Sequence, residues 1–206
     1  MEPNQAAEHL QTIRTLMERS AVYRRALAPV MTFCGVIGIA GGVAGNWLPM
    51  NSARAFVLYW AVVAAVALTG TFLLVRRQSL KDAEPFWSPP TRRVTQALIP
   101  PLVVGAFLGV MVVWLELPRE ICAMLAALWF LLYGLAIHAA GFFMPRGLKL
   151  FGWWFLISGG LIFQVILARG IGDESVLNWL MGGLFGGSHL AYGIYLYFTE
   201  KRRKAT

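Results

Sequence analysis

The sequence predicts an all-α integral membrane protein in which six transmembrane helices form one bundle of three antiparallel hairpins. Of the 206 residues, 58% are hydrophobic and only 14% are charged, which leaves too little polar surface for a soluble domain. Six apolar segments are each long enough to cross a hydrocarbon core of about 30 Å, which takes about 20 helical residues. No Ser-, Gly- or Pro-rich linker divides the chain, so we expect one compact bundle.

Residues 1–26 are expected to form an amphipathic helix before the first span. At 100° per residue, one stripe is apolar, and the charged side chains lie away from it. The segment lacks the apolar core and the cleavage site of a signal peptide. Such a helix would lie on the inner leaflet or pack against the cytoplasmic loops. The apolar stripe consists of Ala6, Leu10, Ile13, Met17 and Ala21.

The transmembrane domain is expected over residues 27–198, with a basic tail at 199–206. Proline and glycine mark the breaks at "NWLPMNSAR", "LELPRE", "MPRGLK" and "RGIGDES". Because these connections are short, consecutive helices should be antiparallel neighbours. The expected spans are 27–48, 53–75, 95–115, 121–143, 148–168 and 176–198.

The distribution of Lys and Arg predicts how the bundle is oriented. Fifteen of them lie in the two terminal segments and in the connections after the second and fourth spans, against three in the other connections. By the positive-inside rule, both termini should lie in the cytoplasm of a bacterial inner membrane. The net charge of +8 is then explained by orientation and by attraction to anionic lipid, and we expect no nucleic-acid partner.

The longest connection, "RRQSLKDAEPFWSPPTRR", combines aromatic and basic residues. Phe86 and Trp87 suit an anchor at the membrane interface, with the neighbouring arginines at the head groups. The same stretch could instead be a docking surface for a protein partner. The predicted lipid or partner contacts are Arg76, Arg77, Phe86, Trp87, Arg92 and Arg93, together with Arg202 and Arg203 of the tail.

The interiors of the six expected spans contain no Asp, Glu, Lys or Arg. This argues against ion-coupled transporters, proton pumps and voltage sensors, which keep ionisable residues at depth. The cysteines, Cys34 and Cys122, form neither a disulfide framework nor a CxxC metal motif. His138 and His189 therefore remain the most notable polar residues at depth.

Each histidine shares a helical face with small residues, the pattern that lets membrane helices approach closely. We therefore expect both imidazoles to face protein. The first span carries the same pattern. The glycines predicted to lie at helix contacts are Gly38, Gly42, Gly134, Gly182, Gly186 and Gly193.

Three interpretations of the histidines can be compared. His138 and His189 could bind haem iron axially, but their expected depths differ by about 6 Å. Ser188 and His189 cannot form a catalytic dyad, because adjacent helical residues point about 100° apart, and no GxSxG or HExxH motif is present. The structural interpretation gives each imidazole one hydrogen bond across a helix interface, to Tyr133, Tyr192, Ser158 or a backbone carbonyl.

Four stretches together resemble a family of uncharacterised small polytopic bacterial membrane proteins over nearly the whole chain. They are "TLMERSAVYRRALAP", "LLVRRQSLKDAEPFWSPPTRRV", "GLAIHAAGFFMPRGLKLFGW" and "GGSHLAYGIYLYFTEKRRK". Members often accompany winged-helix DNA-binding regulators, so the resemblance implies a regulatory or envelope-associated role. It implies no activity, ligand or catalytic residue.

The functional expectation is a non-enzymatic scaffold, regulatory or accessory subunit that acts through its basic cytoplasmic face. Its partners would be anionic lipid and a protein in the membrane or the cytoplasm, and a homo-oligomer is also compatible with the sequence. Two alternatives remain open at this point. One is a channel or carrier for a neutral small molecule. The other is a redox subunit that binds haem or contacts quinone through His138 and His189; otherwise we expect no cofactor.

Overall fold

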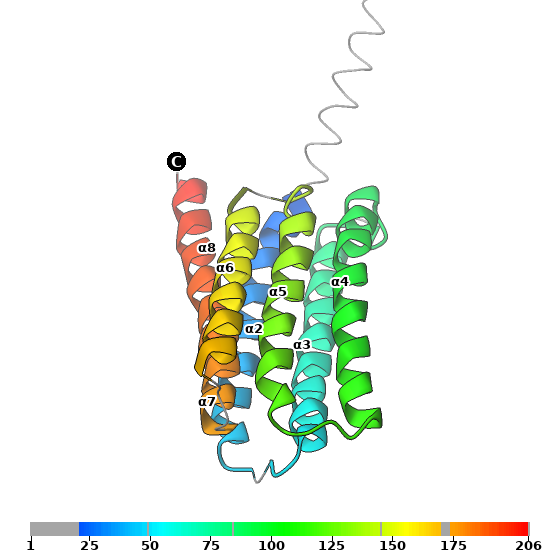
Figure 1. Cartoon of the computed structure of the whole chain (residues 1–206). Coiled ribbons are helices and arrows are strands. Elements are labelled where there is room, and N and C mark those ends of the chain that lie inside the picture. The colour runs from blue at the N-terminus through cyan, green and yellow to red at the C-terminus, as the bar shows by residue number, and fades with distance from the viewer. Residues whose placement is uncertain (1–20, 49, 84, 145, 170–173, 206) are drawn as a thin grey trace, which may run out of the picture.

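The computed structural model is all-helical in the residues that it describes, which are 21–48, 50–83, 85–144, 146–169 and 174–205 (Figure 1). Five of its helices are long and apolar enough to cross a membrane, which supports a multi-pass membrane protein. Most of the amphipathic helix expected at 1–26 falls outside the described residues. The five helices are α2 (Ala21–Gly45), α3 (Ala53–Lys81), α4 (Pro89–Trp114), α5 (Ile121–Ala140) and α6 (Arg146–Arg169).

The sixth expected span is interrupted where the sequence predicted one continuous helix. It consists of α7 (Glu174–Trp179), a π-helical segment η1 (Leu180–Gly187) and α8 (Ser188–Ala205). A π-helix has wider turns than an α-helix, and such segments occur frequently at functional sites. The segment "LMGGLFGG" is half glycine, and glycine tolerates unusual backbone geometry and close helix approach. A residue pattern based on 3.6 residues per turn cannot predict this π-helical segment.

Several helix ends differ from the expected spans because the helices continue into polar sequence, and α8, for example, continues past residue 198 to Ala205. α3 continues past residue 75 to Lys81, and α4 begins at Pro89 instead of residue 95. A proline is tolerated in the first turn, where its missing N–H would have no helical partner. Hydropathy marks only the apolar part of a helix, so it misses such extensions.

The helices form two layers of three (Figure 1). In one layer α2 lies between α3 and the η1–α8 segment, and in the other α5 lies between α4 and α6. Two of the expected hairpins, α2 with α3 and α4 with α5, are close neighbours. The third differs from expectation, because α6 packs closely against α5 and α8 packs closely against α2. α2 begins and α8 ends at the same end of the bundle.

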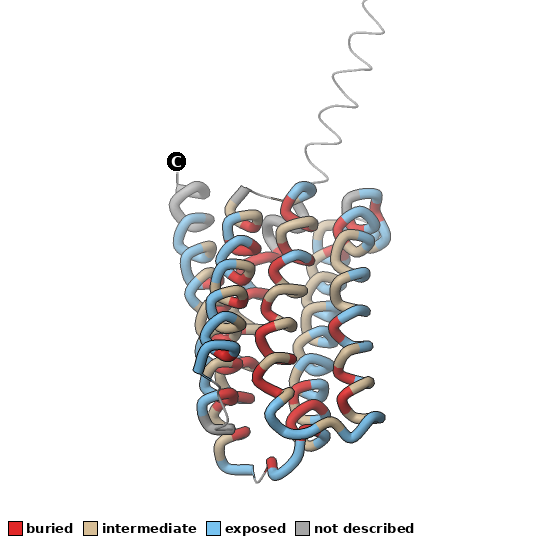
Figure 2. The backbone as a smooth tube through the Cα atoms, viewed as in Figure 1, coloured by how far each residue is buried: buried red, intermediate tan, exposed pale blue. Residues whose placement is uncertain are grey.

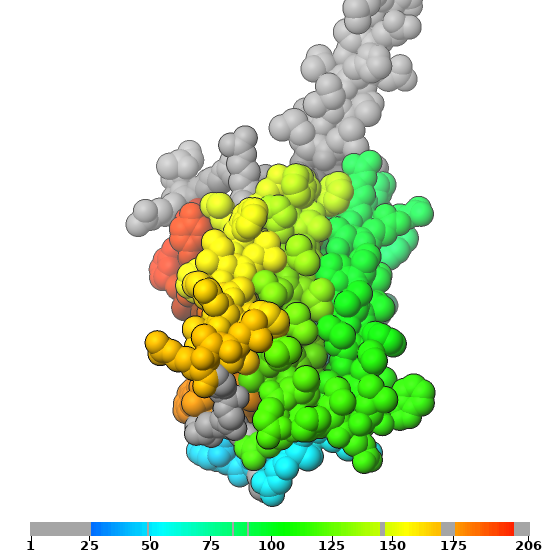
Figure 3. All heavy atoms as spheres, in the orientation of Figure 1, coloured from blue at the N-terminus to red at the C-terminus, as the bar shows by residue number. Residues whose placement is uncertain are grey.

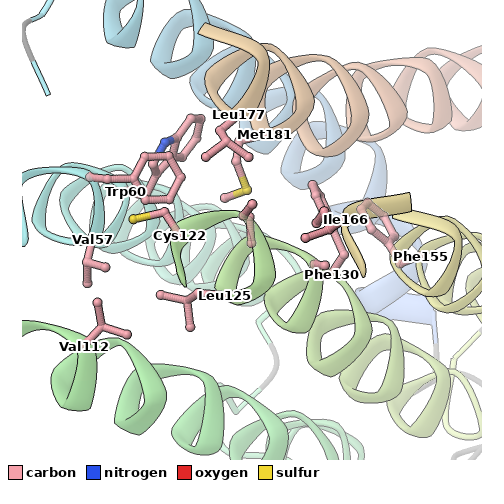
Figure 4. Close-up of a cluster of buried hydrophobic side chains, with 14 of the residues drawn as sticks. Val57, Trp60, Val112, Cys122, Leu125, Phe130, Phe155, Ile166, Leu177 and Met181 are labelled. Carbon is pink, nitrogen blue, oxygen red and sulfur yellow. The ribbon is translucent and has the colours of Figure 1, made fainter. Parts of the chain in front are cut away.

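Large side chains fill the space between the two layers. Burial is concentrated on the inward faces of the helices, above all on α5 (Figure 2). Half of the α5 span is buried, against 11% of the α3 span and 17% of the α4 span. The outer faces of α3, α4 and α6 therefore present apolar side chains to the surroundings, as lipid requires. Figure 3 shows one face of the bundle, formed by α4, α5 and α6. The core includes Val57, Trp60, Val112, Leu125, Phe130, Phe155, Ile166 and Met181 (Figure 4).

Candidate functional site

His189 lies in the first turn of α8, and its side chain is buried. Its Nδ1 lies 2.7 Å from the backbone oxygen of Phe185, and its Nε2 lies 2.6 Å from the hydroxyl oxygen of Tyr133. A carbonyl oxygen can only accept, so Nδ1 must carry a proton. In the neutral ring Nε2 then accepts from the Tyr133 hydroxyl. The environment thus selects one tautomer and uses both ring nitrogens.

Aromatic rings surround the His189 imidazole. The ring centroids of Phe185, Phe151 and Phe155 lie 4.3, 5.0 and 5.6 Å from that of the imidazole. The Tyr133 ring lies 5.4 Å away. These rings come from η1, α5 and α6, so His189 is held at a junction of both layers. The arrangement fixes the imidazole firmly, as expected for a structural residue.

Ser188 and His189 contact different neighbours although they are adjacent in sequence. The Ser188 hydroxyl accepts a hydrogen bond from Trp154 Nε1 at 2.8 Å, which joins α8 to α6. His189 instead contacts Tyr133 on α5. The hydrogen bonds of the two side chains therefore reach two separate helices, although the α6 rings of Phe151 and Phe155 also contact His189.

His138 occupies a different environment, in the last turn of α5. Its Nδ1 lies 3.4 Å from the backbone oxygen of Lys149, a long and weak contact. The rings of Phe142 and Trp153 meet the imidazole edge to face, at 5.4 and 5.3 Å. The Lys149 ammonium lies 3.7 Å from the centre of the Phe142 ring, which makes a cation–π contact.

The contacts of His138 and His189 do not fit a haem iron held between them. Among the described residues, the ring and hydrogen-bond contacts of the two imidazoles are made by different residues, and a bond from His189 Nε2 to iron would displace the Tyr133 hydroxyl. Among the described residues, no three or more His, Cys, Asp or Glu side chains are grouped to hold a metal ion.

Glycines line the contact between α2 and the η1–α8 segment. A Cβ atom added to Gly38 would lie 2.7 Å from the Cα of Gly186, and one added to Gly42 would lie 2.7 Å from the Cα of Gly182. Further along, a Cβ on Gly193 would meet Thr32 at 2.5 Å. Real side chains do not fit at such distances, so these backbones can pack this closely only with glycine.

A second glycine contact joins α5 to α6. A Cβ on Gly134 would lie 2.8 Å from the backbone nitrogen of Leu156. Gly152 and Gly159 on the facing helix were not among the predicted contact glycines. An added Cβ there would meet His138 at 2.6 Å and Leu131 at 3.0 Å, respectively. Their separation of seven residues, about two helical turns, was the available signal.

A buried polar contact near the opposite end of the bundle was also missed. Trp60 Nε1 donates to Asn178 Oδ1 at 3.0 Å, and the Asn178 side chain is buried. Next to it, the Tyr59 hydroxyl donates to the backbone oxygen of Gly41 at 2.5 Å. These bonds attach α3 to α7 and to α2. A sequence shows that Trp60 and Tyr59 can donate hydrogen bonds, but it does not show which distant group accepts them.

The connection between α3 and α4 carries the basic and aromatic residues singled out in the sequence. Phe86 packs edge-on against Phe72 of α3, with centroids 5.2 Å apart, and Trp87 is largely exposed. The side chains of Arg202 and Arg203 lie outside the described part of α8. The exposed cations at this end include Arg76, Arg77, Lys81, Arg92 and Arg93.

Comparison with known proteins provides no relative for this chain. No protein-family model, no curated protein and no solved structure matches it.

Proposed function

We propose that this protein is a non-enzymatic accessory or regulatory subunit of a bacterial inner membrane, which acts through its basic end. The observation that carries the proposal is the exposure of Arg76, Arg77, Arg92 and Arg93 around the connection of α3 and α4. Among the described residues, no ion pair engages these guanidinium groups. They are thus free to contact anionic lipid or an acidic partner.

The aromatic residues of the same connection suit a position at the membrane interface. Phe86 is held against the lipid-facing ring of Phe72, and Trp87 extends beside it. Such rings favour the head-group level, where each nearby Lys or Arg gains about 1 kcal/mol from an anionic leaflet. With the positive-inside rule, this end faces the cytoplasm, where a regulatory partner would bind.

The contacts of the interior support a scaffold over a redox subunit or a carrier. Both nitrogens of His189 are engaged within the protein, and four aromatic rings enclose the imidazole. A redox role through this residue would need a free nitrogen. A carrier for a polar solute would need polar groups open to its path, and the midplane side chains described here are bonded to one another.

Co-purification of the full chain from native membranes tests this proposal. A tagged protein extracted under mild conditions should retain a companion in constant ratio. Replacing Arg76, Arg77, Arg92 and Arg93 together with glutamine should release that companion. The matched control replaces Arg54 and Arg169, which lie at the opposite end, and it should retain the companion. Recovery of the bare wild-type protein would count against a subunit role.

A further inference from the structure

Gln164 is a polar side chain on the outer, lipid-facing side of α6. It is exposed, and no hydrogen bond joins it to any of the described residues. Its surroundings on the same helix are apolar, with Ile157, Leu161 and Leu167 all exposed. An amide offers two donor hydrogens and an acceptor oxygen, and hydrocarbon satisfies none of them.

The position of Gln164 along α6 places it within the hydrocarbon. The apolar span runs over 23 residues from Gly147 to Arg169, so its middle is near Ser158. Gln164 follows that middle by six residues, or about 9 Å of helix, whereas the hydrocarbon extends about 15 Å from its centre. The amide therefore lies about 6 Å inside the apolar layer.

Gly160 lies one turn before Gln164 on the same face. A Cβ added to Gly160 would meet nothing within 4 Å, whereas one added to the neighbouring Gly159 would meet Leu131 and Phe130 of α5. Gly160 thus has open space beside it, where a second helix could approach. Figure 3 shows α6, in yellow and orange, on the outside of the bundle. Open space beside an amide that has no partner among the described residues is the combination that allows another helix to approach and to bond.

We propose that this face of α6 binds the same face of a second copy of the chain, forming a twofold-symmetric dimer in the membrane. Two copies in one membrane share their orientation, so the twofold axis runs along the membrane normal and places both Gln164 residues at one depth. Each amide can donate to the carbonyl oxygen of the other. The two Gly160 residues let the backbones come close enough for these bonds.

The amide's own chemistry favours a second copy over a different partner. A side chain that is both donor and acceptor is complementary to itself, so symmetry alone supplies a correctly placed partner. Gln96 on α4 is also exposed, but it lies within one turn of Arg92 and Arg93, at the head groups. Gln96 therefore provides a matched control for Gln164.

This inference does not depend on the proposed accessory function. The dimer would use the side of α6, whereas the accessory function uses the basic end at the connection of α3 and α4. A dimer without a companion protein, or a companion bound to a monomer, would separate the two proposals.

Single-molecule photobleaching of the labelled full chain in liposomes, at several protein-to-lipid ratios, measures the association. The fraction of liposomes that bleach in two steps should be larger for the wild type than random capture of two copies in one liposome would give. Gln164→Leu should weaken association about 3- to 30-fold, the range for interhelical hydrogen bonds in membranes. Gly160→Leu should also weaken association while thermal stability in detergent is retained, because the new side chain enters open space. Gln96→Leu should associate like the wild type.

Photo-crosslinking in native membranes identifies the occupant of this face. A photoreactive residue at Leu161 should yield a product of twice the chain's mass, whereas one at Val104, on the lipid face of α4, should not. Three outcomes would each overturn the proposal. The wild type could remain monomeric at every density, or Gln164→Leu could associate as strongly as the wild type. The product crosslinked at Leu161 could also contain a different protein.

Discussion

The hydroxyl of Tyr133 lies 2.6 Å from Nε2 of His189, which joins the middle helix of one layer to α8 of the other. The imidazole completes the connection by donating from Nδ1 to the Phe185 carbonyl of η1. The bond thus links α5 to the point where the π-helical segment returns to α-helix. The contribution of this hydrogen bond to the free energy of unfolding can be measured directly.

Tyr133→Phe removes the hydroxyl and keeps the ring, so His189 Nε2 loses its donor in an apolar site. We expect the protein to lose about 1–2 kcal/mol of stability. Unfolding in mixed detergent micelles measures the loss. His189→Ala should cost a similar amount, and the double variant should cost less than the sum. Fully additive losses would show that the two side chains do not interact.

Gly186→Leu places a side chain where η1 meets α2, because even a Cβ there would contact the backbone of Gly38 at 2.7 Å. The two helices must separate, so folded yield and thermal stability should fall sharply. Gly183→Leu is the control in the same segment, since its Cβ would meet nothing within 4 Å. Thermal denaturation in detergent compares them, and equal behaviour of the two variants would contradict the glycine contact.

Ala83→Gly should stabilise the connection that follows α3. Ala83 has a φ of 52°, in the left-handed region where a Cβ atom costs about 1–2 kcal/mol. Glycine removes this cost but is more flexible when unfolded, so we expect a net gain of about 0.5–1 kcal/mol. Glu116, with a φ of 48° after α4, offers an independent repeat of the experiment. A loss of stability in both variants would contradict the strained geometry.

The visible absorption spectrum of the purified protein tests the contacts of His189 against haem binding. Because both ring nitrogens are hydrogen-bonded, protein from haem-producing cells should show no Soret band. The outcome that opposes this expectation is specific: a Soret band that disappears on His189→Ala but persists in Tyr133→Phe.

The sequence predicted the apolar helices well because lipid imposes a simple rule on composition and length. It could not predict η1, since a wider turn leaves the hydropathy of "LMGGLFGG" unchanged. It indicated the glycine faces of the first and sixth spans but not that these two faces meet. Short connections suggested that α6 and α8 would pair, whereas Gly152 and Gly159 of α6 pack against α5, and Gly186 and Gly193 pack against α2.

The same limit applies to the polar contacts. Tyr133 was among the partners considered for His189 because few polar groups lie at that depth. The bond from Trp60 to Asn178 was not foreseen, because residues so far apart in sequence meet only once the helices are packed. The sequence places Gln164 in the fifth span, but the outward direction of its side chain depends on which side of α6 packs against α5.

The contact of α2 with α8 determines when this bundle can be completed during biosynthesis. Gly35 of the first span packs against Leu190 of the last, which leaves the ribosome about 150 residues later. At a synthesis rate of 5–20 residues per second, roughly 8 to 30 s pass between the synthesis of the glycine face of α2 and that of the α8 residues that pack against it. During that interval the nascent chain exposes a helix-binding surface to other membrane proteins, so insertion factors that shield first spans should matter for its yield.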